Sequence, residues 1–218
     1  MSQFEYKLFY KRSLPHQQPA GTALFVTSRL AGSLPAQVLS RLRIEARRME
    51  LALDGVDVGE ERENTAYSYQ RQLFGKWDTA LDTCATGPRW LSDAAVAALV
   101  ADSIRYRDGS VYDLLAFCIM PNHMHLVFTP LSDEDGHPYA LSKIMQSLKG
   151  YTARACNRIL GRQGGFWQHE SYDHWVRDEA EYQRIVRYVT ANPVRAGLAD
   201  HWEDWPWTYV RDVPQCKL

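Results

Sequence analysis

The stretch Phe117-Cys118-Ile119-Met120-Pro121-Asn122-His123-Met124-His125-Leu126-Val127-Phe128 decides the fold. Two apolar runs flank a Pro-Asn pair, a pattern that predicts a strand, a tight turn and a second strand. Residues two apart on a strand project from the same face, so His123 and His125 point one way. Two imidazoles on one face are what a divalent metal needs from a single strand. An edge strand with two solvated histidines accounts for the pair alone equally well.

Composition places the chain among globular proteins. Its 218 residues are 45% hydrophobic and 23% charged, which suits one domain with enlargements or a small insertion. No apolar run approaches the ~18 residues of a membrane span, and the N-terminus lacks the apolar segment of a signal peptide. We therefore expect a cytoplasmic protein with no membrane partner. The four cysteines form no CxxC pair, so neither a zinc knuckle nor a disulfide framework is indicated.

Charge is unevenly distributed along a chain whose net charge is −1. Between residues 54 and 93 there are eight acids and four bases, whereas residues 143–162 carry five bases and no acid. We expect this basic segment to meet a polyanion although the total charge is near zero. Solvated helix faces account for the same pattern without a partner. The candidate DNA contacts in the segment are Lys149, Arg154, Arg158 and Arg162.

Residues 1–22 form a basic and aromatic N-terminal arm that ends in a proline-rich stretch. Aromatic side chains stack on unpaired bases and cations meet phosphates, so Tyr6, Lys11 and Arg12 are candidate contacts to single-stranded nucleic acid. Packing of the arm on its own domain is an equally good interpretation.

Apolar periodicity predicts the remaining elements. Strands are expected at 22–30, 111–120, 123–128 and, as one aromatic strand, 166–168 with 172–176. Helices are expected at 35–54, 93–105 with a Ser92 cap, 139–160, and from an Asp178 cap to Pro193, with a short helix at 77–81. This order predicts an α+β fold, a ferredoxin-like antiparallel sheet with helices packed on one face. We expect a single domain over 1–218, with 54–90 as an acidic insertion that contains helix.

The last predicted helix carries the second chemical feature. Tyr188 and Asn192 are four residues apart, so they share one stripe of the helix near its end. A phenol is a poor nucleophile at neutral pH because its pKa is about 10. It can nevertheless attack a phosphodiester that a divalent cation polarises. The chain thus offers a metal site at His123 and His125, a nucleophile at Tyr188 and a carboxamide ligand at Asn192.

Other side chains compete for these roles. Tyr151 is closer in sequence to the histidines and lies within the basic segment, so it stays an alternative nucleophile. We interpret Tyr172 and Tyr182 as packing residues. His169 and His174 are interpreted as structural or DNA-contacting residues, because a metal with three ligands needs open positions for a phosphate oxygen and water.

The Met-Pro-Asn-His-Met-His segment at 120–125 and the Tyr-Val-Thr-Ala-Asn-Pro-Val-Arg-Ala-Gly-Leu segment at 188–198 together resemble the single-tyrosine HUH transposases. The resemblance is specifically to the REP-associated tyrosine transposases. It extends to shorter stretches at 25–27, 87–91, 166–168 and 172–179. An isolated His-x-His is weak evidence, whereas the two segments in this order are strong evidence. The acidic insertion departs from the family pattern.

The resemblance implies the HUH endonuclease fold and a metal-dependent single-stranded DNA endonuclease and strand transferase. In that family the two histidines and a Gln or Asn one turn after the tyrosine hold Mg²⁺ or Mn²⁺. The tyrosine keeps the 5′ phosphate end and releases a 3′ hydroxyl. Carried over by position, Tyr188 is the nucleophile and Asn192 the third ligand, and we expect Arg195 to contact DNA. The DNA implied is a hairpin from repetitive extragenic palindromes, with a short guide contacted near the N-terminus, bound by a monomer or homodimer.

Two other functions remain open from the sequence. A hairpin-binding regulatory protein could keep the fold without cutting. A metal hydrolase of small molecules is disfavoured by the arginines at 154, 158 and 162, and it would show no steep fall of DNA affinity with salt.

Overall fold

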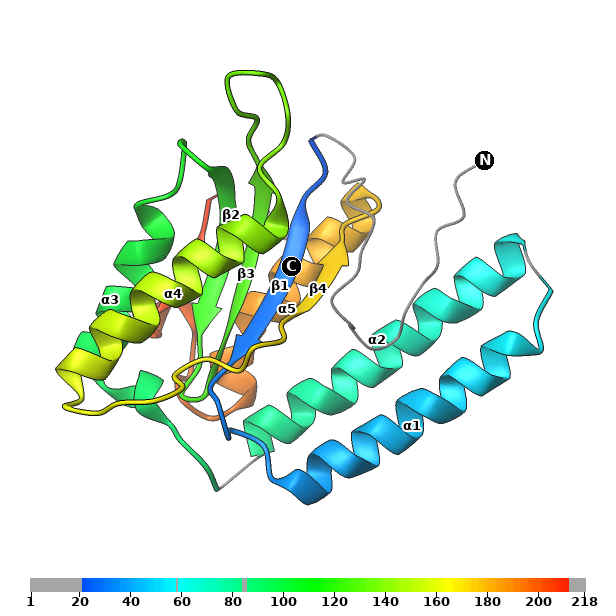
Figure 1. Ribbon diagram of the computed structural model, residues 1–218, viewed down its shortest axis with the longest axis horizontal. Helices are drawn as coiled ribbons and strands as arrows, with labels where there is room; N and C mark the ends of the chain where they lie inside the picture. The colour runs from blue at the N-terminus through cyan, green and yellow to red at the C-terminus, as the bar shows by residue number, and fades with distance from the viewer. Residues whose placement is uncertain (1–20, 58, 84–85, 212–218) are drawn as a thin grey trace. The chain divides into compact units, whose positions relative to one another are not determined.

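The computed structural model describes residues 21–57, 59–83 and 86–211. The predicted DNA contacts Tyr6, Lys11 and Arg12 lie outside the described residues. Within them, five strands form one antiparallel sheet (Figure 1). The strands are β1 (Leu24–Arg29), β2 (Tyr112–Ile119), β3 (His123–Pro130), β4 (Tyr172–Trp175) and β5 (Thr208–Val210).

Their order across the sheet is β4-β1-β3-β2-β5. The predicted hairpin lies near the centre of the sheet, since β3 pairs with both β1 and β2. The helices are α1 (Ala36–Asp54), α2 (Glu60–Thr83), α3 (Ala94–Arg105), α4 (Leu141–Ile159), α5 (Glu179–Arg195) and the 3-10 helices η1 (Trp90–Ser92) and η2 (Trp202–Asp204). The predicted α+β class with an antiparallel sheet is confirmed. Among the described helices, none has the length and apolarity that crossing a membrane requires.

Helices α3 and α4 cover one face of the sheet, as the sequence predicts (Figure 1). Alternate residues of each strand face these helices and form the main core. The strands contribute Leu24, Val26, Leu114, Phe117, Leu126 and Phe128. The helices contribute Val96, Val100, Ile104, Ile144, Met145 and Leu148.

Helix α5 lies on the opposite face of the sheet and contacts β2 and β3 (Figure 1). The arrangement with helices on one face therefore holds for α3 and α4, and α5 adds a layer on the other side. Val186 and Val189 are the buried apolar residues that α5 presents. The residues of β1 and β3 that share this face include both histidines, because His125 pairs directly with Thr27 and His123 with Arg29.

Several element boundaries differ from the sequence prediction. Asp93, not Ser92, caps α3, because its carboxylate accepts hydrogen bonds from the amides of Ala95 (2.9 Å) and Val96 (3.1 Å). Residues 166–168 are not part of β4, and only Trp167 forms an isolated bridge there, to Leu30. The three-residue strand β5 is too short to give a periodic signal.

Residues Gly32–Gly87 form a compact unit of their own, which contains α1 and α2. Helix α2 comes from the predicted acidic insertion at 54–90. It has 24 residues, whereas the sequence predicts only a short helix at 77–81. A small apolar cluster joins the two helices through Leu42, Ala46 and Leu73. Polar contacts add to it, since the Arg62 guanidinium donates to the carbonyl of Val56 at 2.9 Å beyond the end of α1.

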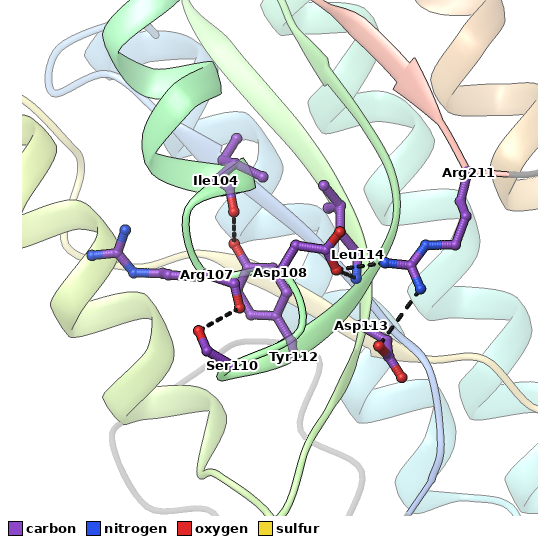
Figure 2. Close-up of polar contacts among 8 residues, drawn as sticks. All are labelled: Ile104, Arg107, Asp108, Ser110, Tyr112, Asp113, Leu114 and Arg211. Atoms are coloured by element: carbon purple, nitrogen blue, oxygen red, sulfur yellow. Dashed lines mark hydrogen bonds and ion pairs between the residues drawn. The ribbon is translucent and has the colours of Figure 1, made fainter.

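Strand β5 is anchored to β2 by Arg211 (Figure 2). Its guanidinium donates to the Asp108 carboxylate at 2.5 Å and lies 3.5 Å from that of Asp113. The same Asp108 oxygen accepts the amide of Leu114 at 2.8 Å, next to the bulge between Leu114 and Ala116. One carboxylate therefore holds the irregular start of β2 and the end of β5 together.

Candidate active site

A two-residue turn sets the position of His123. The amide of Met120 donates to the carbonyl of His123 at 2.8 Å, so Pro121 and Asn122 close a tight hairpin turn. The amide of Leu30, beyond the end of β1, donates to the carbonyl of Asn122 at 2.9 Å. The turn is thus tied to both neighbouring strands, which fixes the backbone from which the first imidazole projects.

Each imidazole is oriented through its Nδ1 atom. His123 Nδ1 lies 2.7 Å from the Asn122 amide oxygen, and His125 Nδ1 lies 2.8 Å from the Thr27 hydroxyl. An amide oxygen only accepts, so the tautomer of His123 that makes this hydrogen bond has its proton on Nδ1. This arrangement leaves Nε2 as the atom that each ring turns toward its partner, and the two Nε2 atoms are 3.1 Å apart.

This geometry fits a bound divalent cation. Nitrogen or oxygen ligands held at about 2.0–2.1 Å from one small ion and at right angles to each other lie about 3 Å apart. The Nε2 separation of 3.1 Å agrees with that figure. Hydrogen bonds from the second ring nitrogen to an amide oxygen or hydroxyl are the usual way in which proteins fix metal-binding histidines.

Tyr188 lies beside this pair. Its ring centroid is 5.6 Å from that of His125, with the planes at 71°, and 6.2 Å from that of Phe25 in an edge-on contact. Phe25 in turn stacks on His125 at 5.7 Å. The three rings come from β1, β3 and α5, so the aromatic contacts hold the phenol against the strand that carries the imidazoles.

Asn192 follows Tyr188 by one helical turn, so it lies on the same side of α5 as the tyrosine. The prediction that Pro193 ends the helix is wrong, because a proline in the last turn removes only one backbone hydrogen bond and α5 continues to Arg195. The helix closes at Gly197, which has a φ of 66°. The Gly197 amide donates to Val194 and the next amide donates to Pro193, a Schellman ending.

The Asn192 side chain is the least satisfied group in this region. It is fully buried, and neither its amide oxygen nor its amide nitrogen has a hydrogen-bond partner among the described residues. Leaving a buried amide unpaired is costly. A cation that accepts the Asn192 oxygen as a ligand would remove that cost for the oxygen, so the donor set of His123, His125 and Asn192 fits the predicted metal.

Arg195 follows Tyr188 by seven residues, which brings both to one side of α5. The guanidinium carbon lies 5.5 Å from the centre of the Tyr188 ring. A cation over this ring adds positive charge next to the phenol. Arg195 is also exposed, so the same charge is accessible to a phosphate.

Two of the predicted DNA contacts have partners within the protein. The Lys149 ammonium donates to the carbonyls of Gln168 (2.6 Å) and His169 (2.9 Å) and to the Ser171 hydroxyl (3.1 Å). Burial lowers the pKa of Lys149 to about 8. The Arg162 guanidinium lies 3.6 Å from the centre of a tryptophan ring, that of Trp90, and also donates to Gly165. These contacts join α4 to neighbouring loops.

The other two predicted DNA contacts on α4 face solvent. Arg154 and Arg158 are exposed, as is the alternative nucleophile Tyr151 at 51%. Because α4 packs on the face of the sheet opposite α5, Tyr151 lies across the sheet from His125. The structure therefore brings Tyr188, and not Tyr151, to the imidazoles.

Sequence reasoning missed the residues that orient this site. Thr27, Phe25 and Asn122 contact the catalytic candidates, yet a threonine or phenylalanine in a strand carries no chemical signal of its own. His174, interpreted from sequence as structural or DNA-contacting, bonds the buried Glu181 at 3.0 Å. The register of the strands supplies these partners, and it becomes visible only once the sheet is assembled.

Comparison with known proteins shows what this chain is similar to. The family model described as "Transposase IS200 like" matches residues 103–192, a range that contains both histidines, Tyr188 and Asn192. A REP-associated tyrosine transposase of Escherichia coli is 29% identical over 112 residues, which cover 50% of this chain and 62% of that protein. The resemblance to REP-associated tyrosine transposases is confirmed.

A second relative is the putative REP-associated tyrosine transposase of Haemophilus influenzae. It is 27% identical over 108 residues, which cover 47% of this chain and 61% of that protein. The chain thus matches about three fifths of the length of these transposases. A solved REP-associated tyrosine transposase, bound to a REP hairpin, superposes with a TM-score of 0.51 at 15% identity, over 91% of this chain and 82% of that one. That likeness shows a shared fold.

Proposed function

We propose that the protein is a metal-dependent single-stranded DNA endonuclease and strand transferase that acts on palindromic hairpins through a phosphotyrosine at Tyr188. The observation that carries the proposal is the contact between the imidazole pair on β3 and the Tyr188 ring on α5. The Tyr188 ring lies 5.6 Å from that of His125, the two Nε2 atoms are 3.1 Å apart, and the buried Asn192 amide belongs to the same helix as the tyrosine.

The proposed metal is Mg²⁺ or Mn²⁺, held by His123, His125 and Asn192. Bound there, it supplies charge neutralisation and polarisation of the scissile phosphate. Thr27 and Asn122 keep the Nε2 atoms of the two imidazoles directed at one point. The protein's own contribution is therefore a rigid pair of nitrogen donors and one amide oxygen.

In the proposed cleavage step the Tyr188 oxygen attacks the scissile phosphorus. A tyrosine–phosphate ester forms with the 5′ end, the bond from phosphorus to the 3′ oxygen breaks, and the released 3′ hydroxyl gains a proton in place of the one that the phenol loses. One phosphodiester replaces another, so a 3′ hydroxyl can reverse the step without an external energy source. Arg195 supports the attack, because its charge lies 5.5 Å from the centre of the ring whose oxygen loses a proton.

The proposed substrate is a hairpin of the REP type. The support is the confirmed resemblance, together with the two exposed α4 arginines Arg154 and Arg158 and the exposed Arg195. Phosphate contacts of this kind give affinity that falls with salt. Lys149 and Arg162 stay predicted DNA-binding residues. We expect them to act indirectly, by holding neighbouring loops in place.

The test is formation of a covalent adduct. A pool of labelled single-stranded oligonucleotides, each with a palindromic hairpin and randomised flanks, is incubated with the full chain and Mn²⁺ and resolved on a denaturing gel. We expect a labelled band at the position of the protein, lost with EDTA. We expect Tyr188→Phe to abolish the band and the matched substitution Tyr151→Phe to leave it.

A regulatory protein that binds hairpins without cutting is the second outcome. It would bind the pool with salt-dependent affinity, and neither the wild-type chain nor Tyr151→Phe would form an adduct. Absence of both binding and adduct would exclude a nucleic-acid function at this site.

A further inference from the structure

A buried histidine–glutamate hydrogen bond joins β4 to the start of α5, and the proposed chemistry does not use it. His174 Nε2 donates to one oxygen of Glu181 at 3.0 Å, and the other Glu181 oxygen accepts the amide of Arg177 at 2.8 Å. The side chains of His174 and Glu181 are only 10% and 5% exposed. The Glu181 amide itself donates to the carboxylate of Asp178, the N-cap of α5, at 2.7 Å. One hydrogen-bond network therefore joins His174, Arg177, Asp178 and Glu181.

The position of Glu181 on the helix links this network to the nucleophile. Residues seven apart on an α-helix differ by about 20° around its axis and by about 10 Å along it. Tyr188 is seven residues after Glu181, and Asn192 is eleven after it, which again returns to the same side. Glu181, Tyr188 and Asn192 therefore form one stripe that faces the sheet, with the buried network at one end.

A second path runs through the sheet. His174 pairs directly with Phe25 in the register of β4 and β1. Phe25 touches both candidate catalytic rings, at 5.7 Å from His125 and 6.2 Å from Tyr188. The histidine that bonds the helix is thus the strand partner of the phenylalanine that contacts both rings.

We infer that His174 and Glu181 are positioning residues, which fix the rotation of α5 and so aim Tyr188 at the imidazole pair. The tyrosine oxygen is roughly 8 Å from the helix axis, so a rotation of about 10° moves it by about 1.4 Å. Displacements of about 1 Å can cost on the order of 100-fold in rate. The hydrogen-bond network of His174 and Glu181, two helical turns before Tyr188, can therefore control the rate of attack without contacting DNA.

This inference deepens the proposed function and rests on it. Its test uses the full chain, Mn²⁺ and the hairpin oligonucleotide recovered from the wild-type adduct, with single-turnover adduct formation measured against protein concentration. We expect Glu181→Ala and His174→Ala each to lower the maximal rate about 10- to 100-fold and to change the half-saturating concentration by less than about twofold. The double variant should be no slower than the slower single one, because both break one contact.

Gln183→Ala is the matched control, since Gln183 bonds Glu179 in the same part of α5 at 2.7 Å but takes no part in the network. It should react at the wild-type rate. Glu181→Gln keeps an acceptor oxygen and should recover part of the rate lost in Glu181→Ala. This variant also keeps the test possible if Glu181→Ala does not fold.

Two results would overturn the inference while leaving the proposed function intact. One is a maximal rate for His174→Ala and Glu181→Ala within about threefold of wild type. The other is a parallel loss of rate, half-saturation and melting temperature, which marks a purely structural contact. A wild-type chain that forms no adduct at all removes the proposed function first, and this inference with it.

Discussion

The rings of His125 and Tyr188 lie with their centroids 5.6 Å apart and their planes at 71°. The two residues are 63 positions apart in sequence and come from a central strand and from the helix on the far side of the sheet from α3 and α4. Their contact brings a candidate metal ligand next to a candidate nucleophile. The other tyrosine considered for this role, Tyr151, lies on the opposite side of the sheet.

Thr27 is expected to act on metal affinity although it is no ligand. Thr27→Val removes the hydroxyl that holds His125 Nδ1 and should weaken Mn²⁺ binding about 10- to 100-fold. Titration of Mn²⁺ followed by electron paramagnetic resonance measures this. Thr190→Val is the control, because the Thr190 hydroxyl bonds helix carbonyls at 3.1 Å. Equal Mn²⁺ affinities for Thr27→Val and wild type would show that the hydroxyl does not orient the imidazole.

The arginines of α4 and of the loop that follows it should divide into two classes. Substituting Arg154 and Arg158 together by Gln should lower the salt slope of hairpin affinity by about 2, since each phosphate contact contributes about one unit. Arg162→Gln should leave the slope unchanged and lower the free energy of unfolding by about 1 kcal/mol, through loss of the contact with Trp90. Binding at several salt concentrations and urea unfolding measure the two effects. A reduced slope for Arg162→Gln would place that residue on DNA.

Sequence alone recovers the parts of this structure that have a local signal. Alternating apolar residues predict the hairpin that carries His123 and His125, and the spacing of Tyr188 and Asn192 predicts their common stripe. The helix α2 is underestimated because its 24 residues bury only Ala66, Leu73, Asp78 and Leu81. Such a sparse pattern gives little helical periodicity.

Contacts between residues distant in sequence are the part of the structure that the sequence does not reveal. Arg162 looks like a free base in a basic helix until the fold brings Trp90 beneath it, 72 residues earlier in the chain. Lys149 looks similar until three acceptors from the segment before β4 surround it. Charge patterns in sequence therefore predict how many bases a helix carries, and the tertiary contacts decide which of them are accessible.

Asp173 on β4 should make stability depend on pH. Burial raises its pKa to about 6, above the value of about 3.9 in the unfolded chain. The folded state then holds the proton more tightly, so this contribution to stability is fully present below about pH 4 and is lost as the pH rises through about 6. Asp173→Asn removes the titration. The free energy of unfolding of this variant, relative to wild type, should increase by roughly 2 kcal/mol from pH 4 to pH 7, and a constant difference in urea unfolding would refute it.

Asp108 should matter more for stability than its half-exposed position suggests. Asp108→Ala deprives the Leu114 amide and Arg211 of one shared acceptor (Figure 2), and should cost about 1–3 kcal/mol in urea unfolding. Asp102→Ala, whose carboxylate lies 3.9 Å from Arg105 on the surface, serves as control and should cost less than about 0.5 kcal/mol. Similar losses in both variants would mean that β5 is not anchored through Asp108.

The identity of the residue that carries the DNA tests the central claim most directly. The adduct formed with Mn²⁺ and the hairpin pool is digested with nuclease and trypsin, and the modified peptide is sequenced by mass spectrometry. We expect a nucleotide phosphate on the oxygen of Tyr188. A phosphate on Tyr151 or on any other residue would contradict it.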